Sequence, residues 1–199
     1  MKLFLDSAIT DEIKKYYNTG LIDGVTTNPT LIYKSGRDPE DVYQELIDIG
    51  IPDISMEVVG DENTMIGEGR RLIKKFGNRQ ATIKVPCTVE GLAACRALSD
   101  EGARVNVTLI FSLAQSILAF KSGATYISPF VGRVDDNSFN GLELIKEITA
   151  TFCTQDVDTT HVLAASLRDV HSVAECFTYG ADIVTCLLYT SDAADDGVG

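Results

Sequence analysis

Short apolar runs rich in Val, Ile and Leu alternate with longer segments of helical periodicity along almost the whole chain. This alternation predicts repeated units in which each helix crosses back to begin the next parallel strand. We expect eight strands and seven helices. The strands are predicted to begin near Lys2, Ile22, Asp53, Ala81, Ala103, Thr125, His161 and Asp182. The clearest helices are predicted over residues 61–76, 91–100 and 113–121.

Residues typical of helix ends support these boundaries. Ser112 with Gln115 matches a capping box, and Ser166 with Asp169 is a weaker form of the same pattern. Two further N-caps are predicted at Asp61 and Thr88. Glycines are expected to end four helices, because the residue after a helix often has a positive φ, which costs glycine little. They are Gly77, Gly102, Gly123 and Gly180.

A parallel sheet built this way is either an open, doubly wound sheet or a closed eight-stranded barrel. The turn after the first strand, Asp6-Ser7-Ala8-Ile9, lacks glycine, and neither a dinucleotide fingerprint nor a P-loop occurs. Polar residues instead follow strand after strand, and a barrel gathers such residues on its catalytic rim. They are Asp6, Thr26, Glu57, Lys84, Asn106, Thr108, Ser128 and Ser166. We therefore predict an α/β fold, a single (β/α)8 TIM barrel over residues 1–185.

Charge and composition exclude several functions. The 199 residues include 17 Lys+Arg and 29 Asp+Glu, for a formal net charge of −12. Such a surface repels nucleic acid and anionic lipid, so neither is an expected partner. No apolar run approaches the roughly 20 residues that span a bilayer, and Asp6 comes too early for a signal peptide. We expect a cytoplasmic protein.

Neither a disulfide framework nor a metal site is expected. The five cysteines are widely spaced and include no C-x-x-C pair. The two histidines, His161 and His171, lack the spacing of zinc or iron ligands. We therefore interpret the cysteines as buried or incidental thiols.

Lys84 lies late in the apolar strand Ala81-Thr82-Ile83-Lys84-Val85-Pro86. Alternation puts Lys84 on the face opposite Ile83 and Val85, so its side chain can point into a barrel. Burial disfavours an ammonium group and frees the amine to attack a carbonyl and form a Schiff base. An outward-facing lysine paired with a helix carboxylate is the alternative.

Two carboxylates also end strands, Asp6 the first and Glu57 the third. Schiff-base chemistry needs a base for the substrate hydroxyl and an acid or base to help water leave the carbinolamine. Asp6 and Glu57 can supply these roles. The alternatives are a helix cap for Asp6 and a solvated rim charge for Glu57.

Arg133 and Arg168 follow the sixth and seventh strands. Guanidinium groups on neighbouring barrel loops suit a phosphate monoester, and Ser166, predicted to open a helix, can add a hydroxyl and backbone N–H groups. Surface salt bridges are the alternative.

Six segments together resemble the transaldolase family, in its small microbial branch that includes the fructose-6-phosphate aldolases. They are Phe4-Leu5-Asp6, Gly24-Val25-Thr26-Thr27-Asn28-Pro29, Ile83-Lys84-Val85-Pro86 with Thr88 and Glu90-Gly91-Leu92, Asn106-Val107-Thr108-Leu109, Ser128-Pro129-Phe130-Val131-Gly132-Arg133 and Ala164-Ala165-Ser166. The resemblance spans about residues 1–185. It implies a barrel, a Schiff base on Lys84, no metal or organic cofactor, and phosphorylated sugar substrates of the pentose phosphate pathway.

The resemblance also implies roles for individual residues. Asp6 matches the general base for the sugar hydroxyl, and Glu57 with Thr108 matches the pair that positions the water of dehydration and hydrolysis. The positions that match substrate contacts are Asn28, Asn106 and Ser166. The phosphate-binding positions correspond to Arg133 and Arg168, together with Ser166.

Glu57 and Phe130 separate the two branches, because the aldolases resemble one another in having Gln and Tyr there. The pair favours a transaldolase, which transfers dihydroxyacetone from sedoheptulose 7-phosphate to glyceraldehyde 3-phosphate. A fructose-6-phosphate aldolase and a phosphosugar-binding protein without catalysis are the alternatives.

The end of the chain departs from the family pattern. Residues 186–199 lack the apolar face of a barrel helix and resemble translated sequencing-adapter DNA. We therefore expect a barrel truncated after its eighth strand, with a foreign tail. Relatives form homo-oligomeric rings, pentamers or decamers, through C-terminal helices, and this chain is expected to assemble poorly.

Overall fold

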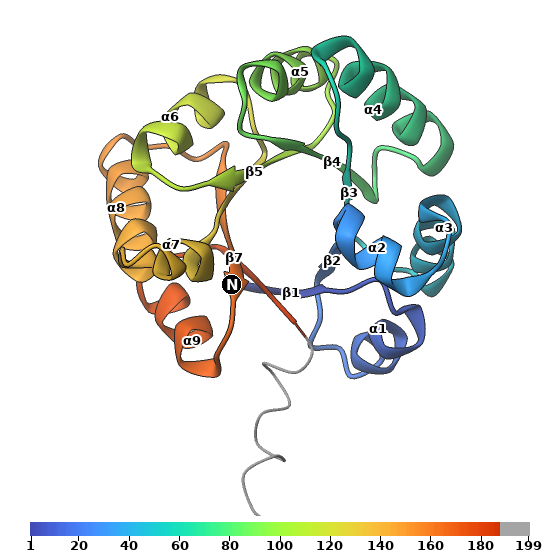
Figure 1. The fold of residues 1–199 in the computed structure, drawn as a ribbon, viewed down its shortest axis with the longest axis horizontal. Helices are drawn as coiled ribbons and strands as arrows, with labels where there is room; N and C mark the ends of the chain where they lie inside the picture. The colour runs from blue at the N-terminus through green and yellow to red at the C-terminus, as the bar shows by residue number, and fades with distance from the viewer. Residues whose placement is uncertain (188–199) are drawn as a thin grey trace, which may run out of the picture.

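The computed structural model describes residues 1–187 and shows a closed barrel of eight parallel strands, surrounded by helices (Figure 1). Neighbouring strands follow chain order, and β1 pairs with β8 to close the barrel. The strands are β1 Lys2–Asp6, β2 Gly24–Thr26, β3 Ile54–Glu57, β4 Ala81–Pro86, β5 Val105–Ile110, β6 Tyr126–Pro129, β7 His161–Leu167 and β8 Ile183–Cys186. The predicted TIM barrel is confirmed, and each predicted start lies within two residues of the observed one.

Each of the seven connections between strands is helical, and two of them contain a pair of helices. The described residues therefore hold nine helices rather than seven. They are α1 Thr10–Tyr17, α2 Pro29–Ser35, α3 Pro39–Ile49, α4 Glu62–Phe76, α5 Val89–Asp100, α6 Leu113–Lys121, α7 Val131–Asp136, α8 Gly141–Thr154 and α9 Val170–Thr178. The extra helices, α2 and α7, directly follow β2 and β6, so both lie at the end of the barrel where the chemistry is expected.

Most of the predicted helix ends are confirmed. The side chains of Asp61, Thr88 and Ser112 cap α4, α5 and α6. The four predicted glycines all have positive φ. The prediction for Ser166 is wrong, because Ser166 lies within β7, and Asp169 caps α9 by accepting a hydrogen bond from the Ser172 backbone N–H at 2.8 Å.

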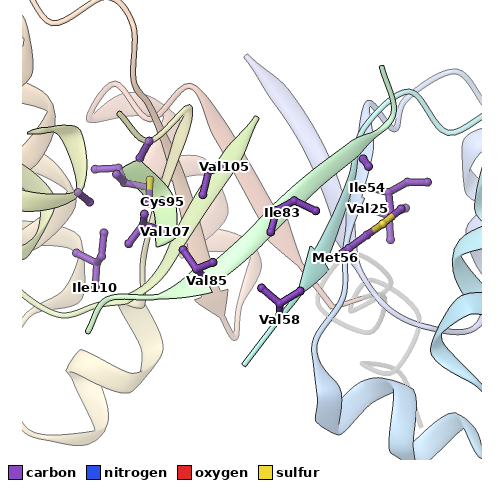
Figure 2. Packing of buried hydrophobic residues seen from close by; sticks show 14 of the residues in the cluster. Val25, Ile54, Met56, Val58, Ile83, Val85, Cys95, Val105, Val107 and Ile110 are labelled. Atoms are coloured by element: carbon purple, nitrogen blue, oxygen red, sulfur yellow. The ribbon is translucent and has the colours of Figure 1, made fainter. Parts of the chain in front are cut away.

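The main hydrophobic core lies between the outer face of the sheet and the helices. Apolar side chains alternate along the strands and fill this layer, as Figure 2 shows for Met56, Ile83, Val85, Val105 and Val107. All five are fully buried. The layer fixes which side chains point inward, because a one-residue slip of a strand would exchange its two faces.

Part of the barrel interior is apolar. Phe4 lies there and meets the Tyr126 ring edge-on at 6.5 Å, with Leu163 and Ile183 in the same cluster. Gly24 on the neighbouring strand leaves room for this packing, since a Cβ there would lie 2.6 Å from the Phe4 ring. The absence of a side chain at Gly24 therefore makes room for the Phe4 ring.

The amino-terminal end of the barrel is closed by a buried polar cluster around Asp53. Its carboxylate accepts hydrogen bonds from Thr82 Oγ1 at 2.7 Å, Arg104 Nη1 at 2.8 Å and Tyr126 Oη at 2.6 Å. Burial and the nearby Asp53 charge raise the pKa of Tyr126, so the phenol stays protonated and donates. One carboxylate, just before β3, thus binds β4, β6 and the residue that precedes β5.

The last described residues are Cys186, which ends β8, and Leu187. The tail predicted over residues 186–199 therefore overlaps β8 at Cys186. Residues 188–199 of this tail lie outside the described residues. Within residues 1–187, none of the helices is long and apolar enough to span a bilayer.

We predict that Asp53→Ala lowers the free energy of unfolding by about 3 kcal/mol, because it leaves the half-buried Arg104 and the buried Tyr126 without their shared acceptor. Urea denaturation measures the loss. Asp48→Ala, which removes an exposed acceptor of Gln44, is the control and should change stability by less than about 0.5 kcal/mol. Equal losses in the two variants would contradict the role of Asp53.

Candidate active site

A cavity of about 480 Å³ opens at the carboxyl end of the barrel. Nine of the ten residues predicted to form the site line it. They are Asp6, Asn28, Glu57, Lys84, Thr108, Phe130, Arg133, Ser166 and Arg168. The tenth, Asn106, is fully buried and does not line the cavity. The strands therefore bring together residues up to 162 positions apart in the sequence, between Asp6 and Arg168.

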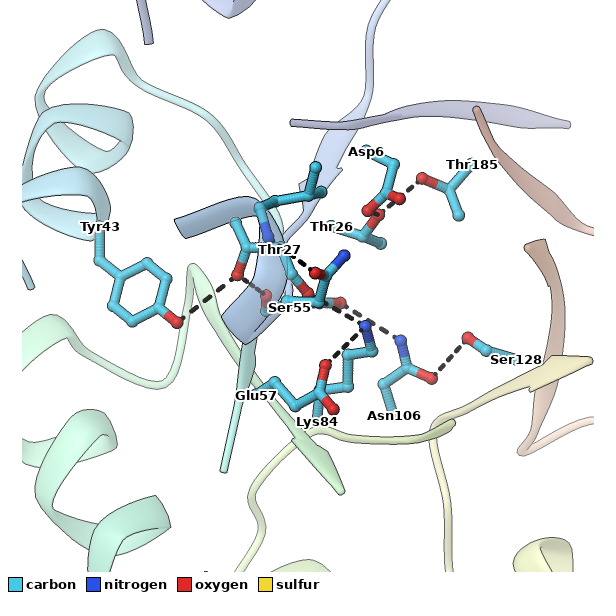
Figure 3. A network of polar contacts seen from close by, with 12 residues as sticks. Asp6, Thr26, Thr27, Tyr43, Ser55, Glu57, Lys84, Asn106, Ser128 and Thr185 are labelled. Atoms are coloured by element: carbon cyan, nitrogen blue, oxygen red, sulfur yellow. Dashed lines mark hydrogen bonds and ion pairs between the residues drawn. The ribbon is translucent and has the colours of Figure 1, made fainter. Parts of the chain in front are cut away.

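Lys84 points into the barrel, as Figure 3 shows, and its side chain is only 7% exposed. The strand register places it beside Glu57 on β3 and Asn106 on β5. Its Nζ lies 3.0 Å from Glu57 Oε2 and donates to the Thr27 carbonyl oxygen at 3.0 Å. Lys84 thus reaches the cavity as one member of a buried ion pair, which rules out the outward-facing alternative.

Asp6, at the end of β1, lies near this pair and accepts a hydrogen bond from Thr26 Oγ1 at 2.8 Å. Burial raises the pKa of Asp6 above its usual value, and the Glu57 charge adds to this effect. The Lys84 charge and the Thr26 hydrogen bond act in the opposite direction without cancelling the effect of burial. The Asp6 carboxylate is therefore held in surroundings that favour its taking a proton.

Thr108 presents a buried hydroxyl to the cavity. Its Oγ1 has no hydrogen-bond partner among the described residues. A buried hydroxyl without a partner is costly, so this group is suited to bind a polar atom of a substrate or a water molecule.

Asn106 lies below the cavity, within a chain of hydrogen bonds. Its Nδ2 donates to Ser55 Oγ at 3.3 Å, and its Oδ1 accepts from Ser128 Oγ at 2.8 Å. Ser128 in turn lines the cavity, as Lys84 does. The structure thus places Asn106 where it orients a wall residue, rather than in the wall itself.

The outer wall carries the two arginines. Arg133, on α7, stacks over the Phe130 ring with its guanidinium carbon 5.1 Å from the ring centroid. Arg168 follows β7. Across the cavity, Asn28 caps α2 by accepting a hydrogen bond from the Leu31 backbone N–H at 2.9 Å, and it also lines the wall. The rim is therefore cationic on one side and amide-lined on the other.

Two strand irregularities also shape the cavity. Leu109 on β5 and Ser166 on β7 both have a φ of 61°, although neither is glycine. In each case the pairing register shifts around the residue. Bulges of this kind turn a side chain out of the regular alternation, and both residues line the cavity.

Sequence reasoning gave no role to Thr185, which also lines the cavity. Its Oγ1 lies 2.7 Å from Thr26 Oγ1. Since Thr26 gives its single proton to Asp6, Thr185 is the donor in this contact. The alternation of Ile183-Val184-Thr185, which puts Val184 on the opposite face of the strand from Thr185, is the sequence pattern that could have predicted this position. In addition, residues 1–187 contain no group of His, Cys, Asp and Glu side chains arranged to hold a metal ion.

A buried lysine and two carboxylates at the carboxyl end of a (β/α)8 barrel are suited to chemistry on carbonyl compounds. The family model for transaldolase/fructose-6-phosphate aldolase matches residues 3–196, and the chain belongs to this family.

Relatives from distant organisms are similar over most of their length. The protein named "Probable transaldolase" from Paracoccus denitrificans is 48% identical over 186 residues, which cover 93% of this chain and 84% of that protein. The proteins of the same name from Caldicellulosiruptor saccharolyticus and Nitrosopumilus maritimus are 51% and 46% identical over equal lengths, covering 85% and 83% of those proteins. The matched segment therefore covers most of each of these relatives.

We predict that Thr26→Val shifts the acid limb of the kcat/KM profile to higher pH. The hydrogen bond from Thr26 lowers the pKa of Asp6, so its loss lets burial raise that pKa further. A base that works as the carboxylate then loses activity at a higher pH. Rates of sugar cleavage measured across pH give the profile. Thr185→Val is the matched control, since it removes a hydroxyl that does not donate to Asp6, and an equal shift in both variants would contradict the explanation.

Proposed function

We propose that the protein is a transaldolase that transfers a dihydroxyacetone unit between phosphorylated sugars through a Schiff base on Lys84. The observation that carries this proposal is the position of Lys84, buried in the cavity wall, with its Nζ 3.0 Å from Glu57. Sedoheptulose 7-phosphate is the proposed donor and glyceraldehyde 3-phosphate the acceptor. The products are erythrose 4-phosphate and fructose 6-phosphate.

The first steps require Lys84 to give up a proton. Its Nζ lies 3.0 Å from the Glu57 carboxylate and donates to the Thr27 carbonyl oxygen. Transfer of that proton to Glu57 leaves the neutral amine, which attacks the ketose carbonyl carbon to form a carbinolamine. Glu57 then returns the proton to the departing hydroxyl, and water leaves as the imine forms. The unpartnered Thr108 hydroxyl is suited to hold that water.

Carbon–carbon cleavage then falls to Asp6. Its carboxylate takes the proton of the hydroxyl on the carbon at the far end of the bond that breaks. The oxygen of that hydroxyl becomes the aldehyde carbonyl, and the electron pair of the broken carbon–carbon bond moves into the imine to form an enamine. The raised pKa of Asp6 brings its proton affinity nearer to that needed in the transition state. The aldehyde product leaves, and the enamine carbon attacks the acceptor aldehyde by the same steps in reverse.

Borohydride trapping tests the mechanism. We expect fructose 6-phosphate with borohydride to inactivate the protein and leave a dihydroxyacetone-derived adduct on Lys84, found by peptide mass mapping, because reduction of the imine is irreversible. Lys84→Met, which removes the amine, should show no adduct. A folded wild-type protein that binds fructose 6-phosphate in calorimetry but gives no adduct would instead be a phosphosugar-binding protein.

The residue at position 130 tests transferase against aldolase activity. Phe130 is half-buried, and its ring meets the Phe111 ring at 6.0 Å. Because a phenylalanine ring carries no hydroxyl, it adds none to the cavity. We expect Phe130→Tyr to raise the ratio of free cleavage to transfer at least ~10-fold, because a phenol can order the water or proton that ends the enamine's lifetime. Product assays with and without acceptor measure the ratio, and Phe111→Tyr is the control. An unchanged ratio in Phe130→Tyr refutes this account.

A further inference from the structure

Asp136, the last residue of α7, forms a two-point ion pair with Arg168. Arg168 Nη1 donates to one carboxylate oxygen and Nη2 donates to the other. A guanidinium held at two points has its plane fixed as well as its position. Because Arg168 follows β7 and Asp136 belongs to the preceding connection, the pair ties two neighbouring parts of the rim together.

Asp136 does not itself line the cavity, whereas Arg133 and Arg168 both do. The hydrogen bonds from Arg168 lower the pKa of Asp136, and the charges of Arg168 and Arg133 act in the same direction. The carboxylate therefore stays charged and influences a ligand in the cavity only through the arginines.

Gly132 restrains Arg168 from a second direction. A Cβ at position 132 would lie 2.3 Å from the Ser166 carbonyl oxygen and 2.9 Å from Arg168 Nε. The first turn of α7 can pack this closely on the end of β7 because residue 132 has no side chain. Arg168 thus runs along the α7 backbone at Gly132 and ends at the Asp136 carboxylate.

We propose that Asp136 is a positioning residue that orients Arg168 toward the phosphate group of the sugar substrates. The inference rests on the proposed function, from which it takes the phosphorylated substrate. The side chains of Arg168 and Asp136 are 54% and 46% exposed, and ion pairs this exposed contribute little to folding. The consequence of the pair is therefore the direction in which Arg168 presents its donors.

Asp136→Asn tests the proposal, because it keeps the size of the side chain and removes the two-point acceptor. We expect KM for glyceraldehyde 3-phosphate to rise about fivefold with kcat unchanged. A change of this size corresponds to the free energy that an exposed ion pair contributes. Both constants for unphosphorylated glyceraldehyde should stay the same, since that acceptor has no phosphate for Arg168 to bind. A general loss of structure would affect both acceptors.

Glu143→Gln is the matched control. It also removes one negative charge, from α8, where Glu143 pairs with Lys146 and not with Arg168. We expect it to leave both KM values unchanged, so an equal rise in Glu143→Gln would assign the effect to net charge and overturn the proposal. Inorganic phosphate binding, measured by calorimetry, should weaken in Asp136→Asn alone.

An unchanged or lower KM for glyceraldehyde 3-phosphate in Asp136→Asn also overturns the proposal, because Asp136 would then be inert or would compete with phosphate for Arg168. Thermal unfolding of each variant shows that the proteins compared are folded. A folded wild-type protein that transfers to neither acceptor refutes the proposed function itself. Normal wild-type transfer, with no difference between acceptors in the variant, refutes only the role of Asp136.

Discussion

The site depends on the buried ion pair between Lys84 and Glu57. Neither charge is stable inside a barrel without a partner, and removing one partner of a buried pair typically costs about 3–5 kcal/mol. The pair forms because β3 and β4 place the two residues side by side in register. That register is fixed by the apolar layer outside the sheet, which includes Met56 and Ile83 (Figure 2). Packing remote from the cavity thus determines where the Lys84 amine lies.

The barrel interior holds an apolar cluster and a buried polar network, and the proposed chemistry uses both. Phe4, Leu163 and Ile183 form the cluster, on β1, β7 and β8. Ser55 and Asn106, on β3 and β5, belong to the polar network (Figure 3). Apolar surroundings strengthen electrostatic interactions, while the polar network satisfies groups that cannot be left without partners.

The sequence predicts features that local rules decide, and it fails where two distant segments decide together. The strands and the Ser112 cap follow from alternation and capping chemistry within a few residues. Ser166 has the composition of an N-cap, but the shifted pairing of β7 with β8 places it in a strained strand end. Asn106 matches a family contact, yet hydrogen bonds from other strands hold it beneath the wall. Thr185 gains its role only because barrel closure brings β8 beside β1.

Asp6 and Glu57 show how two carboxylates in one cavity can receive different roles from their surroundings. Glu57 Oε2 lies 3.0 Å from Lys84 Nζ, so Glu57 is placed to exchange protons with that amine. Asp6 is desolvated by burial, and its raised pKa indicates that neither Lys84 nor the Thr26 hydroxyl fully compensates its charge. A carboxylate with this imbalance is well suited to accept a hydroxyl proton. In the proposed mechanism, once Lys84 is converted to an imine, the substrate hydroxyl meets Asp6, a base whose pKa burial has already raised.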